Sequence, residues 1–224
     1  MTRSCKRILA LMLTLLLSVS LVPRASAVGR LEEYQDLDPS AWYMLSIQYC
    51  LEHKLMAGYG KQIRTFRPDG TMTRAELVTM LWRMEDKPVT GLTMQYIDVP
   101  EGIWYEDAAR WALSADVMVG ADVTKFAPEQ LITREQLAVA LWQYAKYRNG
   151  FVPEIVDPAF ETYIDRDAIT EGAVDAMRWA NTLGIMTGSK DAKGNKLLTP
   201  WAYVDRASTS AVLMRFCLDM GVCD

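Results

Sequence analysis

The chain has 224 residues and a formal net charge of −4. This acidic balance excludes general nucleic-acid binding as an expected function, because neutralising phosphates requires an excess of Lys and Arg. The chain also has a single histidine, His53, and no Gly-x-Ser-x-Gly motif, so a Ser-His-Asp hydrolase finds little support. No pair among the 28 acidic residues stands out as a glycosidase pair. We therefore predict no enzyme activity, no metal site and no cofactor.

The first 27 residues have the pattern of a secretory signal peptide. Three basic residues, Arg3, Lys6 and Arg7, precede an apolar run over 8–22. An Ala-Ser-Ala sequence follows at 25–27. The run is shorter than the ~20 residues that a membrane span needs, and no comparable run follows. We expect 1–27 to be removed, which leaves an exported chain that does not span the membrane. Loss of its four basic residues makes the formal charge −8.

Three cysteines follow the signal peptide, namely Cys50, Cys217 and Cys223. Their odd number and their spacing fit neither a disulfide framework nor a zinc site. We expect buried free thiols. A single Cys217–Cys223 bridge is the alternative, because an exported protein meets an oxidising environment.

The rest of the chain contains internal repeats, which we place at residues 31–87, 93–148 and 160–221, the last being the most divergent. The first two copies share the pairs Asp36/Asp98, Trp42/Trp104, Gly58/Gly120, Phe66/Phe126, Pro68/Pro128 and Arg74/Arg134. In the third copy, the matching motifs run from Tyr163 to Arg206. Only the loop between the Gly and the Phe changes in length from copy to copy.

Each copy has the periodicity of two helices joined by a Gly- and Pro-containing loop. In the second copy, apolar residues recur at helical spacing over 104–115 and again over 137–145, which gives each helix one apolar face. A unit of about 50 residues is marginal on its own, so we expect the three units to share a core. Residues 191–198 are predicted to form a surface, hairpin-like loop.

The order of these elements resembles the S-layer homology domain family. The motifs are "YQDLD", "LMAG" and "FRPDGTMTRAE" in the first copy, "YIDV", "VMVG" and "FAPEQLITREQ" in the second, and "YIDR", "IMTG" and "LTPWAYVDRAS" in the third. The resemblance implies an all-α fold in which three helix-loop-helix repeats form a pseudo-threefold spindle around a shared helical core. It also implies a secreted protein of the cell wall or S-layer that binds a secondary cell-wall polysaccharide non-covalently. That polysaccharide often carries pyruvylated sugars.

The family's ligand grooves lie between neighbouring repeats. The resemblance implies glycan-binding roles for Arg74, Arg134 and Arg206, for Asp36 and Asp98, for Trp42 and Trp104, and for Gly58 and Gly120. Each also has a structural interpretation. The tryptophans start amphipathic helices and are at least as well suited to the core, the aspartates can turn or cap the chain, and the glycines suit a positive φ or close packing.

The arginine of "TMTRAEL" is the most informative of these residues. Thr73 with Glu76, and Thr133 with Gln136, form capping boxes that explain the Thr and the Glu or Gln. Arg74 is not explained in this way, because a cation in the first helical turn opposes the helix dipole. Free N–H groups at a helix start bind anions, and a guanidinium beside them would hold a carboxylate. There are two alternatives to a ligand role. The arginine of any one copy could be an ordinary solvated surface residue, and descent from a common repeat could explain why all three copies have one.

The third copy departs from the pattern at two positions. Ser208 replaces the Glu of the capping box, although Asp205 remains a good N-cap, and Gly172 stands where the Trp is expected. We expect its groove to be the degenerate one.

A second function, from another class, is a surface module that binds other proteins and whose sugar grooves have decayed. Family anchors usually carry a cargo domain, and this sequence shows none after the third copy. The bacterial wall polysaccharide and other surface proteins are therefore the two expected partners.

Overall fold

The computed structural model describes residues 31–223, so the predicted signal peptide lies outside the described residues. The described chain is mostly helical, which confirms the all-α prediction. Its α-helices are α2 (Met44–Glu52), α3 (Arg74–Met84), α4 (Glu106–Ser114), α5 (Arg134–Asn149), α6 (Val174–Thr182) and α7 (Arg206–Met220). None of the described helices is long and apolar enough to cross a membrane.

Shorter elements connect them. Four 3-10 helices are η1 (Leu31–Glu33), η2 (Phe160–Thr162), η3 (Arg166–Ala168) and η4 (Glu171–Ala173). Strands β1 (Ser189–Lys190) and β2 (Lys196–Leu197) pair antiparallel. The hairpin predicted around 191–198 is therefore confirmed.

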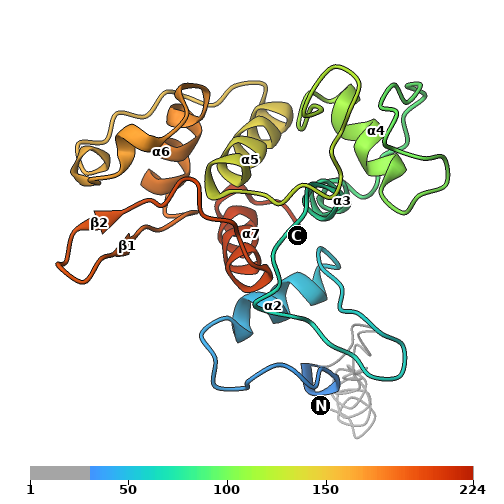
Figure 1. Ribbon diagram of the computed structural model, residues 1–224, viewed down its shortest axis with the longest axis horizontal. Coiled ribbons are helices and arrows are strands. Elements are labelled where there is room, and N and C mark those ends of the chain that lie inside the picture. Colours follow the sequence, from blue (N-terminus) through green and yellow to red (C-terminus); the bar gives the residue numbers. More distant parts are fainter. Residues whose placement is uncertain (1–30, 224) are drawn as a thin grey trace, which may run out of the picture.

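Three central helices, α3, α5 and α7, are surrounded by three outer helices, α2, α4 and α6 (Figure 1). We call residues 31–87, 93–148 and 160–221 segments 1, 2 and 3. Each outer helix packs mainly on the central helix of a different segment, in the pairs α2 with α7, α4 with α3 and α6 with α5. Each central helix is thus covered mainly by an outer helix of another segment, so the three segments interlock around one core.

A closed ring of backbone hydrogen bonds joins the segments just before the central helices. Met72 N–H donates to Val204 O at 3.0 Å, Val204 N–H to Ile132 O at 3.0 Å, and Ile132 N–H to Met72 O at 2.9 Å. All three side chains are buried. Because each residue donates to one segment and accepts from the other, the ring fixes the three helix starts relative to one another.

The central helices begin as the sequence predicts, with Thr73 and Thr133 in complete capping boxes and Asp205 as the third N-cap. Their first N–H groups are not free. Arg74 N–H donates to Gln130 O at 2.9 Å and Ala75 N–H to Pro128 O at 3.0 Å. The same bonds recur at α5 and α7. The expected anion site at free N–H groups is therefore wrong, since the turn of the next segment occupies these donors.

An aspartate at the same position in each segment stabilises the turn that contains the Pro. Asp98 accepts from Phe126 N–H and Ala127 N–H, both at 2.8 Å, and Asp36 and Asp165 do the same in their segments. Ala127 has a φ of +55°, a strained conformation for a residue with a Cβ. The aspartates thus stabilise a strained turn about 30 residues further along the chain, rather than capping the next helix.

Neither Gly58 nor Gly120 has a positive φ. A Cβ on Gly58 would lie 2.1 Å from a ring carbon of Tyr34, and one on Gly120 would lie 2.5 Å from the equivalent atom of Tyr96. Of the two structural interpretations, close packing is therefore the right one: each glycine makes room for the tyrosine that precedes its segment's aspartate.

The cysteines gather where α2 meets α7. Cys50 and Cys217 are buried, as predicted, and burial raises the pKa of the Cys50 thiol to about 12. The Sγ atoms of Cys217 and Cys223 lie 3.0 Å apart.

The aspartate contact yields a stability prediction. Asp98→Asn leaves one of two partly buried N–H groups without a carboxylate acceptor, so the free energy of unfolding should fall by about 1–3 kcal/mol. Urea denaturation followed by circular dichroism measures the change. Asp69→Asn, at an exposed position of the turn in segment 1, is the control and should change stability by less than about 0.5 kcal/mol. Equal losses in both variants would contradict this role.

A second prediction concerns the second residue after the end of each outer helix. Lys54, Asp116 and Gly184 adopt φ values of +57°, +53° and +71°. The left-handed conformation costs a lysine about 1–2 kcal/mol, a cost that glycine does not have. Part of this gain is offset, because glycine has more conformational freedom in the unfolded chain. Lys54→Gly should therefore raise the free energy of unfolding by up to about 1 kcal/mol. Lys61→Gly, at an exposed position without a positive φ, should be neutral or destabilising.

Candidate functional site

A groove of about 480 Å³ lies where the three segments meet. We call it the Arg74 groove. Segment 1 contributes Arg74, segment 2 contributes residues 116–120 and the first turns of α5, and segment 3 contributes residues 170–173 and Trp201. Because all three segments contribute to its lining, the groove exists only in the assembled fold.

Arg74 is held at the base of this groove. Its Nε donates to Phe126 O at 2.8 Å and its Nη2 to Val119 O at 2.6 Å, and its guanidinium lies 5.0 Å from the Phe126 ring centre. The side chain is 8% exposed. Burial lowers the pKa of Arg74, while Tyr96 and Asp98 act in the opposite direction. An arginine nevertheless keeps its charge at neutral pH.

One nitrogen of Arg74 remains available. Within residues 31–223, Nη1 has no hydrogen-bond partner. It is not sealed from solvent, since Trp111 Nε1 is the single side-chain N or O atom of the described chain that is buried without a partner. Nη1 therefore offers its N–H groups to the groove that Arg74 lines.

Gln136 provides a second donor in the same groove. Its Oε1 accepts from Thr133 N–H at 3.0 Å to complete the capping box. Because the Thr133 N–H needs an acceptor, the oxygen of the Gln136 amide must face it, and the Nε2 group then remains available as a donor. Nothing in the described chain accepts a hydrogen bond from Nε2.

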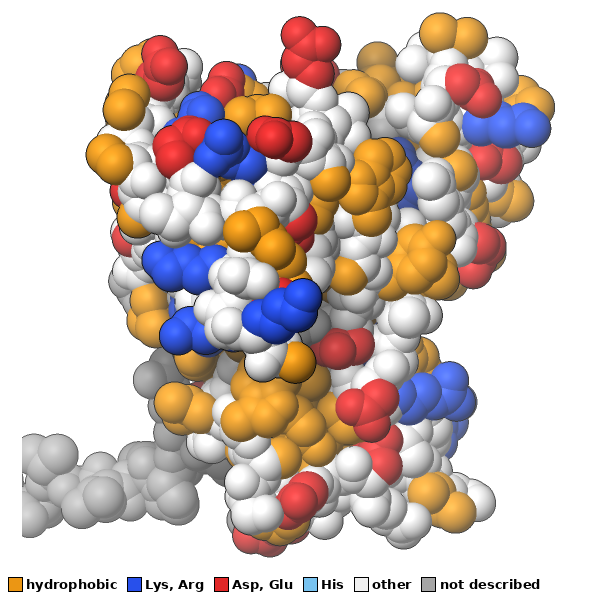
Figure 2. Space-filling view, turned by 60° about the vertical axis from the view of Figure 1, so that its left-hand side comes forward, with side chains coloured by type: hydrophobic (Ala, Val, Ile, Leu, Met, Phe, Trp, Pro, Cys, Tyr) orange, Lys and Arg blue, Asp and Glu red, His pale blue; other side chains and the backbone are white. Residues whose placement is uncertain are grey.

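The acids of the groove do little to neutralise Arg74. Glu135 is buried, and its two oxygens accept from Thr170 N–H at 3.0 Å and from the Thr170 hydroxyl at 2.8 Å. Asp116 lines the other end, after α4. On the face that carries α6, charges of both signs are mixed with apolar patches (Figure 2). An anionic ligand in this groove would therefore depend on local donors rather than on a field of one sign.

The other two arginines repeat the clamp of Arg74. Arg134 donates from Nε to Leu198 O and from Nη2 to Thr187 O, both at 2.8 Å. Arg206 donates to Phe66 O at 2.8 Å and to Ala57 O at 2.7 Å. Each arginine thus binds the loop of the following segment. This contact explains structurally why an arginine stands at the start of each central helix, which the sequence did not reveal.

The remaining implied residues are spread out. Gly120 lines the Arg74 groove. Both oxygens of Asp36 and Asp98 are occupied by the backbone N–H groups of their turns. Trp42 and Trp104 precede their helices and are 68% and 57% exposed, so the core interpretation is wrong. Each packs edge-on against the tyrosine that follows it.

Trp201 is the residue that sequence reasoning missed. It is 61% exposed, lines the Arg74 groove, and is fixed by a 2.7 Å hydrogen bond from Nε1 to Ala168 O. Its signal was a Trp directly after the Pro of the third copy, where the other copies have Asp69 and Glu129. Gly172, which occupies the position of the expected Trp, lies in the same groove.

Residues 33–78 and 98–138 match the family model of the S-layer homology domain. Similar proteins include an endoglucanase of Bacillus sp. strain KSM-635, 29% identical over 84% of this chain and 20% of the endoglucanase. A cellulosome-anchoring protein of Acetivibrio thermocellus is 30% identical over 63% of this chain and 32% of its own length. A surface-layer 125 kDa protein of Lysinibacillus sphaericus is 24% identical over 89% of this chain and 16% of its own length.

The chain thus spans about a third or less of each of these relatives. The similarity concerns one region of much larger proteins, so the catalytic activity named for the endoglucanase does not transfer with it. Residues 33–78 and 98–138 are accordingly the part of this chain that matches the S-layer homology domain.

Proposed function

We propose that this protein is a cell-surface module that attaches to the bacterial cell wall by binding an acidic wall polysaccharide in the Arg74 groove. The match to the S-layer homology domain supports surface attachment. So do relatives named as a cellulosome-anchoring protein, a surface-layer protein and an S-layer protein. The choice of ligand rests on the chemistry of the groove.

The observation that carries the proposal is a pair of hydrogen-bond donors with no acceptor. Arg74 Nη1 and Gln136 Nε2 line one groove, and neither has a partner among the described residues. A carboxylate supplies two acceptor oxygens and a negative charge, which matches an amide donor beside a guanidinium. A pyruvyl ketal places one such carboxylate on a sugar ring.

The walls suit the remainder of a sugar of this kind. Val117, Met118 and Val119 form one apolar side and Val139 and Ala140 another, and the exposed ring of Trp201 offers a flat apolar face. Sugars present C–H faces to aromatic rings, and a pyruvyl ketal also carries a methyl group. Specific pockets combine apolar walls with a few placed polar groups in this way.

Arg134 is a second candidate position. Its Nε and Nη2 are bound, while Nη1 has no partner in the part of the chain that the structure describes. Ser208 stands there in place of Gln136. By the correspondence of the segments, Trp42 lies beside α7 as Gly172 lies beside α5, so we assign Trp42 to the groove of Arg134 and Trp104 to that of Arg206.

The direct test is co-sedimentation of residues 28–224 with purified cell walls, before and after hydrofluoric acid removes phosphodiester-linked wall polymers. Binding that disappears after the acid treatment supports a polysaccharide ligand. Binding that survives it would contradict the proposal and favour a protein partner. Arginine substitutions are poor tools here, because Arg74 also clamps the loop of segment 2 and its loss would destabilise the fold.

Trp201 gives a cleaner variant, since its side chain makes one hydrogen bond, to the exposed Ala168 at the end of η3. Trp201→Ala should weaken wall binding by about tenfold, or ~1.4 kcal/mol, because the stacking face of the Arg74 groove is lost. Trp104→Ala removes an equally exposed indole outside this groove and should leave the affinity unchanged. Binding curves on the same wall preparation compare the two. Equal effects would show that general surface apolarity, rather than this groove, retains the protein.

A further inference from the structure

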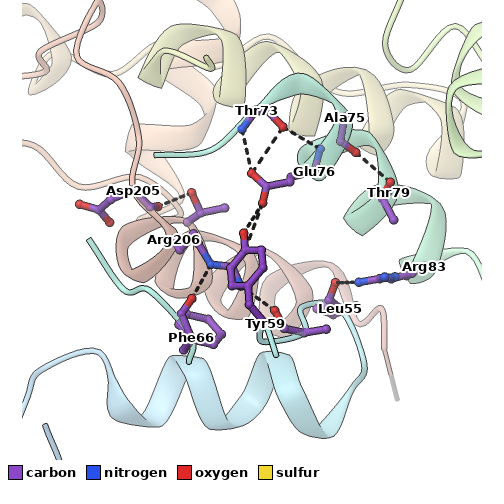
Figure 3. A network of polar contacts seen from close by, with 12 residues as sticks. Leu55, Tyr59, Phe66, Thr73, Ala75, Glu76, Thr79, Arg83, Asp205 and Arg206 are labelled. Atoms are coloured by element: carbon purple, nitrogen blue, oxygen red, sulfur yellow. Dashed lines mark hydrogen bonds and ion pairs between the residues drawn. The ribbon is translucent and has the colours of Figure 1, made fainter. Parts of the chain in front are cut away.

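By the correspondence of the segments, Arg206 occupies the position that Arg74 has in its groove, and we call the surroundings of this residue the Arg206 groove. Arg206 clamps its loop through Nε and Nη2 as Arg74 does, but its Nη1 also has partners. It lies 3.2 Å from the Tyr59 hydroxyl and 3.5 Å from Glu76 Oε1. The three side chains meet between α3 and α7, from two different segments (Figure 3). The nitrogen that is available at Arg74 is therefore occupied at Arg206.

Glu76 makes two kinds of contact at once. Its Oε2 accepts from Thr73 N–H at 3.0 Å, which completes the capping box. Its Oε1 accepts from the Tyr59 hydroxyl at 2.6 Å and faces Arg206. Gln136 is the equivalent residue of segment 2, and it uses its oxygen for the same cap. The two grooves thus differ by a carboxylate oxygen in one and an amide NH₂ in the other.

Tyr59 completes the closure. Its ring lies under the guanidinium groups of Arg206 and Arg67, at 4.8 Å and 4.5 Å from the ring centre. Segment 2 has Ala121 at this position. Burial, and then the hydrogen bond to Glu76, raise the pKa of the Tyr59 phenol, so the neutral hydroxyl remains a donor to Glu76.

We propose that Glu76 is an internal counter-ion that occupies the Arg206 groove in place of a ligand carboxylate. The residue at the third helical position, Glu76 in one groove and Gln136 in the other, then decides which groove accepts an acidic ligand. The nature of that ligand rests on the proposed function. The closure of the groove by Glu76 and Tyr59 does not.

Electrostatics favours the closed state. The side chains of Arg206 and Glu76 are only 4% and 18% exposed, so their interaction is weakly screened by solvent. A ligand carboxylate could replace Glu76 only by leaving a second, partly buried negative charge unpaired, which is strongly unfavourable. From the sequence we expected the third groove to be degenerate because of changes in segment 3. The residues that close it, Tyr59 and Glu76, belong to segment 1.

A reciprocal exchange tests this assignment. Glu76→Gln and Gln136→Glu each install the residue that the other segment already uses in an intact capping box, so both variants should fold. The probe is a methyl hexopyranoside with a 4,6-linked pyruvyl ketal, and its methyl ester is the uncharged control. Isothermal titration calorimetry gives the number of sites and their affinities.

We expect Gln136→Glu to weaken binding at the Arg74 groove by at least tenfold, because the new carboxylate neutralises Arg74. We expect Glu76→Gln to add one site per chain, since Arg206 then lacks its counter-ion. The ester should bind neither protein with measurable affinity. Unchanged affinity in Gln136→Glu, or an unchanged number of sites in Glu76→Gln, would overturn the proposal.

A second measurement needs no ligand. In protein with ¹³C-labelled tyrosine, the Tyr59 resonance, assigned with Tyr59→Phe, reports the phenol pKa. Glu76→Gln should lower that pKa, since it removes a negative charge and the acceptor that favours the neutral phenol. An unchanged pKa would mean that Glu76 does not hold Tyr59 in the groove, and would overturn the closure.

The two measurements separate this inference from the proposed function. If the wild-type protein binds the sugar and Gln136→Glu binds it equally well, the polysaccharide function stands and the counter-ion role is wrong. If no variant binds the sugar while the Tyr59 pKa falls in Glu76→Gln, the groove is closed as described and the proposed ligand is wrong.

Discussion

The three-membered ring of backbone hydrogen bonds at Met72, Ile132 and Val204 is the constraint on which the rest of the structure depends. It sets three helix starts side by side, so that each helix meets the Pro-containing turn of the next segment. The helix N–H groups are then satisfied by that turn instead of by water or a ligand. Because the bonds close on themselves, loss of one segment would leave unpaired groups in both others.

The arginines show how one residue serves two purposes. A guanidinium has five N–H donors in a fixed plane. In Arg74 and Arg134, Nε and Nη2 bind carbonyls of the neighbouring loop, while Nη1 has no partner among the described residues. Structural clamping and anion binding are therefore compatible in a single side chain. Lysine, with one compact ammonium group, would not provide both contacts in this geometry.

The three segments share a set of contacts but differ in the chemistry around their arginines. The Asp-held turn, the packed Gly and the clamping Arg recur in all three segments, and they preserve the shape. The differing residues are Glu76 against Gln136, Tyr59 against Ala121, and Trp104 against Gly172. Of these, Gln136 and Gly172 line the Arg74 groove. An interlocked fold allows such divergence, because these side chains contribute little to the shared core.

The sequence by itself determined the helices, their caps and the spacing of the motifs, because periodicity and capping are local properties of the chain. It also singled out Arg74 as a residue that a helix cap does not explain. Only the tertiary structure decided what the aspartates bind, that the helix N–H groups are already occupied, and that Trp201 and Gln136 share a groove with Arg74. These contacts join residues from different segments. No local pattern encodes them, because the ring of segments brings together positions that lie between about 30 and 150 residues apart.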